Sequence, residues 1–441
     1  MTPRPGRFRG GSPEKCRTGR LIPFLGAFCL FLSTVEYLIP KPLPFMRIGL
    51  ANLPLLLGLD LLSPGAFALL ALIKILGQAL ITGTLFSYVF LFSLAGTAAS
   101  GTVMYMLRNT LGPARTGFTG ISVVGALLSN AVQMLLACLF IFGSSAKLMI
   151  PPFLVMGIVT GAMLGLFCEA FAARSRWFKR QREALGPGAA SGTASAGRES
   201  VPLAGDSAGP GPDPQDTSAA ARRKTARRRR AFWNRLRPAE LCAAALIMAA
   251  AFLCNPSPLL RSLQFLLFWL FAYLSGKQIR PLVILPAMLG IVLFNLFPPY
   301  GRVLAEWGAL RITAGALLTG LRKALTLEGL ILLSRAVIRP DLRFPGPLGA
   351  LVAESFRLFE RIGPLGTGGG TKKAGLIAGI DKLMLELSAE QDAARRQNPP
   401  DTGVSADKAS PGFAPPLSGR LVLCTAVLAA AALTAAAFLR A

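Results

Sequence analysis

The chain has 441 residues, of which 53% are hydrophobic and 15% are charged, and its formal net charge is +26. This composition fits repeated crossings of a bilayer better than an ordinary soluble domain. The charge does not predict a nucleic-acid partner, because the Lys and Arg residues lie between and beside the apolar runs, as in cytoplasmic loops. The absence of histidine excludes imidazole acid–base catalysis, a Ser-His-Asp triad and a His-ligated metal. The seven cysteines show no Cys-x-x-Cys spacing, so no metal site is predicted.

The first half of the chain contains six apolar segments that predict membrane spans. A helix needs roughly 20 residues to cross the hydrocarbon. The basic segment 1–20 precedes the first span and resembles the start of a signal peptide, but no small-residue cleavage site follows, so we expect a retained span with a cytoplasmic N-terminus. The second segment is short and contains Pro54, which predicts a kinked or partly re-entrant helix. The six segments are 21–39, 48–62, 65–82, 85–107, 118–142 and 152–172.

Composition divides the rest of the chain. Segment 173–238 is rich in Gly, Ala, Ser, Pro and Arg and ends in the basic run 221–230, which predicts a disordered basic linker. The basic run either anchors the topology of the next span or attracts anionic lipid or a nucleotide-linked partner. Four apolar stretches at 241–253, 259–274, 282–297 and 311–338 then predict a second transmembrane region, 239–338. An amphipathic region at 339–396, a linker at 397–420 and a final span at 421–439 bring the total to about eleven spans.

Polar residues inside the predicted spans are candidates for a binding site, because an ionisable group at membrane depth is costly and usually faces a cavity or a partner. Glu36 lies near the end of the first span. Lys74 and Gln78 are four residues apart in the third span and share a helical face. Asn130 and Gln133 are three apart in the fifth span and also share a face. Together these residues predict one pocket that opens outward and binds a small molecule.

Each candidate also has a purely structural interpretation. Asn130 and Gln133 can form interhelical hydrogen bonds that only hold the spans together. Lys74 can pair with Asp60 or extend its ammonium to the interface. Glu36 can be an interfacial carboxylate exposed to water. The small residues of 83–96, 120–126 and 157–165 predict close helix packing and carry no functional information.

The connection between the first two spans, VEYLIPKPLPFMRIGLANLPLLLGLD, holds positive residues on the side of the membrane where they are disfavoured. Its prolines favour extended backbone, and non-helical backbone at this depth is tolerated where it lines a watery cavity. We therefore add Arg47 and Asn52 to the predicted binding residues, as part of an outward-facing vestibule.

Three sequence elements carry a family resemblance: IPKPLPFMRIGLANLPLLLGLDLL, GTLFSYVFLFSLAG and GISVVGALLSNAVQMLLA. With them, residues 21–172 resemble the Gx transporter family, which is also named heptaprenyl diphosphate synthase component I. Members of that family are similar to the substrate-binding S components of energy-coupling-factor (ECF) transporters. The resemblance implies a six-helix bundle with cytoplasmic termini.

The second half resembles the T component of the same transporter class, a cobalt-permease-like transmembrane subunit, most clearly at RITAGALLTGLRKALTLEGLILLSRAVIRPDLRFPGPLGALVAESFRLFERI. The resemblance implies amphipathic helices that lie along the cytoplasmic face and couple ATPases to the S component. The Ala-Arg-Gly-like coupling motif of that family is represented only by AARRQ at 393–397. The ATPase-coupling residues implied by the resemblance are Arg339, Arg343, Glu354, Arg357 and Arg395.

The sequence thus predicts an all-α, multi-pass protein of the cytoplasmic membrane that acts as a membrane subunit of an ECF-type importer. It is not expected to be an enzyme or to bind a cofactor, because the Gly-rich run 363–373 lacks the order of a P-loop and ATP is expected to be used by separate ABC-type ATPase subunits. The alternative is a non-catalytic membrane component of heptaprenyl diphosphate synthesis, since the chain has no Asp-Asp pair for a magnesium diphosphate. A membrane scaffold without a ligand is a third possibility.

Overall fold

The computed structural model describes residues 13–38, 49–112, 115–184, 238–275, 281–298, 300–307, 310–338, 346–367, 376–397 and 417–439. Arg47, Arg339, Arg343 and the basic run 221–230 lie outside these residues, as does most of the predicted linkers 173–238 and 397–420. The described part is nearly all helical, which confirms the predicted fold class.

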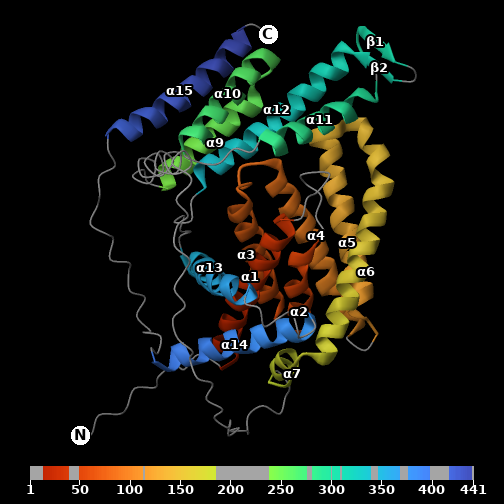
Figure 1. The fold of residues 1–441 in the computed structure, drawn as a ribbon, viewed down its shortest axis with the longest axis vertical. Helices are drawn as coiled ribbons and strands as arrows, with labels where there is room; N and C mark the ends of the chain where they lie inside the picture. The colour runs from red at the N-terminus through yellow and green to blue at the C-terminus, as the bar shows by residue number, and fades with distance from the viewer. Residues whose placement is uncertain are drawn as a thin grey trace, which may run out of the picture.

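The first half forms a bundle in which the chain runs up and down between two ends (Figure 1). Every predicted apolar segment corresponds to a helix, and the second is short, as predicted. The elements are α1 (Pro13–Leu38), η1 (Leu50–Asn52), α2 (Leu53–Leu61), α3 (Pro64–Thr82), α4 (Tyr88–Leu111), α5 (Phe118–Ala137), the π-helical η2 (Cys138–Phe142), the 3-10 helix η3 (Gly143–Met149), α6 (Ile150–Arg174) and α7 (Arg176–Glu183).

Helix α7 lies inside the segment predicted to be a disordered linker. Its Trp177 and Phe178 are buried, and the Trp177 ring stacks on Phe24 of α1 with 5.3 Å between the ring centroids. The basic residues around these two aromatics are exposed. Two adjacent aromatics inside a basic run are enough to fix one short amphipathic helix to the bundle.

The second half contains α9 (Pro238–Cys254), α10 (Pro258–Leu274), α11 (Pro281–Leu296), α12 (Ala314–Val337), α13 (Gly346–Thr367), α14 (Leu376–Gln397) and α15 (Leu417–Leu439). The predicted helical stretch 311–338 is wrong at its start, because Leu310–Thr313 is strand β2, which pairs antiparallel with β1 (Val303–Trp307). Helices α9, α10, α12 and α15 run obliquely across one end of the first bundle (Figure 1).

Buried polar side chains connect the helices of this second half. Arg261 of α10 donates from Nη1 to Thr326 Oγ1 of α12 (2.8 Å) and from Nη2 to the carbonyl oxygen of Leu253 at the end of α9 (3.2 Å). Gln264, one turn later, donates from Nε2 to the Ala430 carbonyl (2.8 Å) and to Thr434 Oγ1 (2.9 Å) of α15. Polar groups buried among apolar helices need such partners, and here they fix four helices relative to one another.

Five helices of the described residues are long and apolar enough to cross a membrane, by length and composition: 18–36, 64–82, 88–111, 118–142 and 150–174. Five more apolar helices are shorter, at 50–61, 240–254, 258–274, 284–296 and 423–437. Helix α12, which contains Arg322, Lys323, Glu328 and Arg335, is in neither group. These helices indicate a multi-pass membrane protein, although fewer of them reach full membrane length than the eleven predicted spans.

The two halves contact each other at both ends of the first bundle. At the end nearest α11 and α12, Asn295 Nδ2 donates to the carbonyl oxygen of Ile141 in the π-helical segment (3.2 Å). The Phe86 backbone N–H, in the turn between α3 and α4, donates to Ser334 Oγ of α12 (3.1 Å). At the other end, α13 packs along α1 and α14 lies beside α7 (Figure 1).

Helices α13 and α14 share one hydrophobic core with the first bundle. Val352, Leu358 and Ile362 of α13 and Met384 and Leu387 of α14 are buried in the same cluster as the middle turns of α1 and the aromatics of α7. The predicted amphipathic region 339–396 is therefore helical where the structure describes it, and its apolar face covers the bundle. On α13 the contact with α1 is close: a Cβ on Gly26 would lie 2.7 Å from Ser355 Oγ.

Candidate functional site

The first bundle contains a polar cavity of about 40 Å³. All the main helices of the bundle contribute to its wall, although their outer surfaces are apolar. The polar side chains that line it are Glu36, Asn52, Lys74, Gln78, Thr97, Ser100, Ser122, Ser129, Asn130, Gln133 and Thr160. A group of buried hydroxyls, amides and charges inside a membrane-type bundle is costly to maintain and indicates a binding site.

One wall of the cavity comes from α1, η1, α2 and α3 and holds both charged residues. The Lys74 ammonium, in the middle of α3, donates to Asn52 Oδ1 and, at 3.3 Å, to Thr97 Oγ1. Glu36 Oε2 accepts a hydrogen bond from the backbone N–H of Gly49 (3.2 Å). Gly49 has φ of 90°, a left-handed conformation that glycine adopts without strain, and this turn places Asn52 at the start of α2.

The opposite wall comes from α4, α5 and α6 and carries neutral polar groups. Gln133 Nε2 donates to Ser129 Oγ one turn earlier on α5 (2.9 Å). Asn130 Nδ2 donates to the carbonyl oxygen of Phe153 on α6 (3.0 Å). Thr97 and Ser100 follow one another along α4 on the same face. This wall offers hydrogen bonds without charge.

The structure brings together six of the seven residues predicted to bind substrate. Glu36, Asn52, Lys74, Gln78, Asn130 and Gln133 all line this cavity, and Arg47 lies outside the described residues. The sequence reasoning missed the hydroxyl residues Thr97, Ser100, Ser122, Ser129 and Thr160. The signal that could have found them is spacing: Thr97 and Ser100 are three residues apart, and Ser122 and Ser129 are seven apart, so each pair shares a helical face. In the sequence, however, small residues in spans were interpreted only as sites of close packing.

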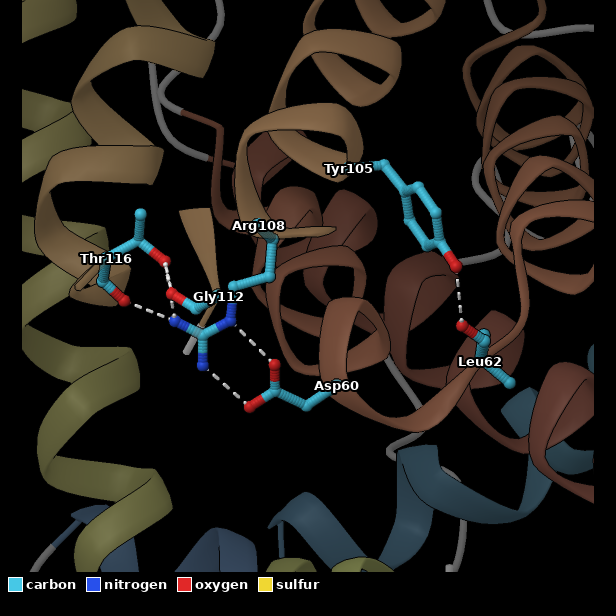
Figure 2. A network of polar contacts seen from close by, with 6 residues as sticks. All are labelled: Asp60, Leu62, Tyr105, Arg108, Gly112 and Thr116. Carbon is cyan, nitrogen blue, oxygen red and sulfur yellow. Dashed lines mark hydrogen bonds and ion pairs between the residues drawn. The ribbon is translucent and has the colours of Figure 1, made fainter. Parts of the chain in front are cut away.

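The structural interpretation of Asn130 is compatible with its place in the cavity wall, because the same amide joins α5 to α6 and faces the cavity. The proposed pairing of Lys74 with Asp60 is wrong. Asp60, at the other end of α2, accepts from Arg108 Nε and Nη2, each at 2.8 Å (Figure 2). The Arg108 side chain is 9% exposed and that of Asp60 is 10% exposed.

The Arg108 side chain joins three segments at this end of the bundle. Besides Asp60, it donates from Nη1 to the backbone oxygen of Thr116 and to Thr116 Oγ1, and Thr116 Oγ1 donates to the Gly112 carbonyl (2.9 Å) (Figure 2). The guanidinium also lies 4.7 Å from the centroid of the Phe118 ring. This cluster fixes α2, α4 and the start of α5, and its role is structural.

Of the residues implied in ATPase coupling, Glu354 and Arg357 belong to α13 and Arg395 belongs to α14. Arg357 is exposed on α13, on the face that points away from the bundle, and Glu354 is partly buried. Arg395 belongs to α14, and its side chain lies outside the described residues, as do Arg339 and Arg343. Among the coupling candidates whose side chains the structure describes, Arg357 is therefore the exposed one.

A carboxylate from α14 caps the first turn of α7. Asp381 accepts from Ser175 Oγ and from the backbone N–H groups of Arg176 (3.1 Å) and Trp177 (3.0 Å), and Ser175 Oγ in turn accepts from the Phe178 N–H (3.0 Å). The first N–H groups of a helix have no partner within the helix, and a negative charge there is favourable. Asp381 thus ties α14 to the junction of α6 and α7.

Removing this cap is expected to loosen α14 from the bundle. In Asp381→Ala, Ser175 and two helix N–H groups lose their acceptor, which should cost about 1–3 kcal/mol of the free energy of unfolding. Amide hydrogen exchange of the purified protein should show faster exchange in α7 and α14. The neighbouring exposed Lys382→Ala serves as the control and should leave exchange unchanged. Equal protection in both variants would contradict the role of Asp381.

The comparisons with known proteins cover two parts of the chain. Residues 25–171 match the family described as heptaprenyl diphosphate synthase component I. Residues 238–340 match a domain of unknown function, DUF8519. No curated protein and no solved structure matches the chain. The part of the chain that holds the cavity is thus similar to a family named as one component of heptaprenyl diphosphate synthase.

Proposed function

We propose that this protein is a membrane subunit of an energy-coupling-factor-type importer, in which the first bundle binds a small molecule and the second half transmits work from separate ATPases. The observation that carries the proposal is the polar cavity inside an otherwise apolar bundle. Substrate binding is assigned to the cavity residues Glu36, Asn52, Lys74, Gln78, Asn130 and Gln133, together with Arg47. The protein itself needs no cofactor in this scheme, because ATP is used by the partner.

The packing of α13 and α14 supports the coupling role. Helix α13 packs along α1, which carries Glu36, and α14 is tied through Asp381 to the end of α6, which carries Thr160. A displacement of either helix therefore moves an element that lines the cavity. ATPases that move these helices would shift the bundle between states of different affinity, which is the requirement for coupled transport.

The proposal includes an orientation. We place the protein in the inner (cytoplasmic) membrane. Since α13 and α14 must reach soluble ATPases, the end of the bundle that carries α7 faces the cytoplasm. The exposed basic residues Arg174, Arg176, Lys179, Arg180 and Arg182 cluster at that end, as the positive-inside rule requires. Helix α1 begins at the same end of the bundle (Figure 1).

A second candidate is a non-catalytic membrane component of heptaprenyl diphosphate synthesis. The name of the family that matches residues 25–171 favours it. In that case the partner is the catalytic prenyl synthase subunit. The polar side chains around the cavity then hold the helices of the bundle together or bind a regulatory ligand.

Purification of the full chain from its native membrane, followed by identification of the bound partners, separates the two candidates. We expect ABC-type ATPases to co-purify, and we expect Arg357→Glu to reduce their recovery severalfold, because it reverses a charge on the exposed face of α13. Arg302→Glu, an exposed arginine beside the β-hairpin, is the matched control and should retain the ATPases. Recovery of a prenyl synthase without ATPases would contradict the importer and support the second candidate.

A further inference from the structure

We propose that helix α7 binds the phosphate groups of anionic lipids through a cationic face that is fixed at the edge of the membrane. Helix α7 follows α6 after the single residue Ser175. This surface is separate from the cavity and from the ATPase-coupling residues, so its ligand is independent of the transported substrate. The exposed basic residues of α7 and of the last position of α6 are Arg174, Arg176, Lys179, Arg180 and Arg182.

The end of α6 places α7 at the level of the lipid headgroups (Figure 1). Helix α6 has 25 residues and is one of the helices long and apolar enough to cross a membrane. At 1.5 Å per residue it is about 38 Å long, which exceeds the roughly 30 Å of the hydrocarbon but not the roughly 40–45 Å of the whole bilayer. Val155, Met163 and Leu166 are exposed along α6, as expected of side chains in contact with lipid tails. The next helix therefore begins where lipid phosphates lie.

The buried side of α7 fixes the orientation of its basic side. Trp177 and Phe178 are buried in the core of the bundle, and a carboxylate from α14 caps the first turn of the helix. Arg176, Lys179 and Arg180 are three and four residues apart, so they share the side of the helix that faces away from the two aromatics. A topology signal requires only that basic residues stay on one side of the membrane. Here the cations lie together on a helix whose position is set by packing.

The five basic side chains have no carboxylate partner within the described residues. None of them forms an ion pair there, and the one carboxylate of α7 is that of Glu183. Like charges at three- and four-residue spacing repel one another. Lipid phosphates bound between them relieve this repulsion, and a guanidinium can donate two parallel hydrogen bonds to one phosphate. Each basic residue near an anionic membrane surface strengthens binding roughly fivefold, so a cluster of this size favours stable contact with such lipids.

Lipid binding to the detergent-purified full chain tests the assignment. The probe is fluorescent phosphatidylglycerol in dodecyl maltoside micelles, and its fluorescence anisotropy reports binding. Unlabelled phosphatidylglycerol should displace the probe, whereas phosphatidylcholine with the same acyl chains should compete about tenfold more weakly or worse, because its headgroup has no net charge. Binding should weaken as the salt concentration rises, since these cations are exposed. Inorganic phosphate at the same concentration as the competing lipid should not displace the probe.

Charge variants assign the binding to α7. The triple variant Arg176→Gln, Lys179→Gln and Arg180→Gln should bind the probe at least about tenfold more weakly, because three contributions of roughly fivefold are removed. Glu183→Gln removes the negative charge of the same helix and should strengthen binding severalfold. All of these side chains are exposed, so the melting temperature without added lipid should not change. The matched control replaces three exposed arginines of the second half with glutamine: Arg302, Arg311 and Arg322.

The control triple variant should bind phosphatidylglycerol like the wild type. If both triple variants lose affinity equally, binding follows the net charge of the protein and the assignment to α7 is overturned. Equal competition by phosphatidylcholine, or displacement by inorganic phosphate, would reject an anionic lipid as the ligand. If the α7 variant keeps its lipid affinity but loses a protein that co-purifies with the wild type, the face binds an acidic protein instead and the proposal fails. The recovery of ATPases, which tests the importer, is a separate readout.

Discussion

The Asp60→Asn variant is expected to lose about 3–5 kcal/mol of the free energy of unfolding, the usual cost of leaving a buried charge without its partner. The amide keeps one acceptor oxygen, but it carries no negative charge, and its NH2 group replaces the second oxygen that accepts from Arg108. Both side chains are about nine-tenths buried, so water cannot replace the lost partner. The measurement is the melting temperature of the detergent-purified protein.

Two further variants test the interpretation of this pair. The double variant Asp60→Leu with Arg108→Leu leaves no charge stranded and should be more stable than Asp60→Asn. Arg115→Gln, an exposed arginine of the same loop, should melt like the wild type. If the double variant is the least stable of the set, the specific hydrogen bonds rather than the stranded charge determine the loss.

The Gly165→Leu variant should disrupt the packing of α5 against α6. A Cβ at Gly165 would lie 2.4 Å from the Cα of Thr119 and 3.0 Å from the backbone oxygen of Phe118. Backbone atoms cannot rotate away, so the two helices have to separate. We expect a loss of about 3 kcal/mol, the upper part of the range for overpacking, and a lower yield of folded protein. Both are measured by size-exclusion chromatography and thermal unfolding in detergent.

Gly120 provides the matched control for this effect. It lies on α5 of the same helix pair, and a Cβ there meets no atom within 4 Å. Gly120→Leu should therefore fold and melt like the wild type, even though it adds the same side chain. If both leucine variants are equally destabilised, the decrease in stability comes from replacing a glycine and not from a clash between α5 and α6.

The helices of the first bundle could be predicted because most of them are long apolar runs and several begin or end at a proline or glycine. Pro64 opens α3, and Gly83 and Gly112 follow α3 and α4 with positive φ. The prediction of close packing from the glycines of 157–165 is confirmed, since Gly157, Gly161 and Gly165 all face α5 without room for a Cβ. Apolar runs, breakers and small residues are local signals, and a sequence displays them directly.

Pairings between distant residues could not be predicted. The pairing of Asp60 with Arg108 was missed because the sequence does not show that α2 and α4 end side by side. Residues 311–313 of strand β2 were assigned to a helix because the strand is too short to display an alternating pattern. The cap that Asp381 forms on α7 joins residues 204 positions apart in the sequence, and only the packing of α14 brings them together.

The cavity was partly predictable for a physical reason. Charged and amide groups are so costly in a span that Glu36, Lys74, Asn130 and Gln133 stood out individually. Serine and threonine are tolerated in any membrane helix, because they can bond the carbonyl one turn back, as Thr160 does to Met156 (2.8 Å). The hydroxyls of the neutral wall therefore became recognisable only when the helices were assembled around a common space.

The contact between α1 and α13 has a consequence for biogenesis. Gly26 and Ser355 are in close contact, and the apolar residues in the middle of α1 are buried partly by helices α13 and α14, which come late in the chain. Because chains emerge from the ribosome N-terminus first, α1 enters the membrane with one side uncovered. That side is covered only after α13 and α14 have been synthesised. Premature termination before α13 should therefore yield a bundle that quality-control proteases recognise, even though all its own helices have been made.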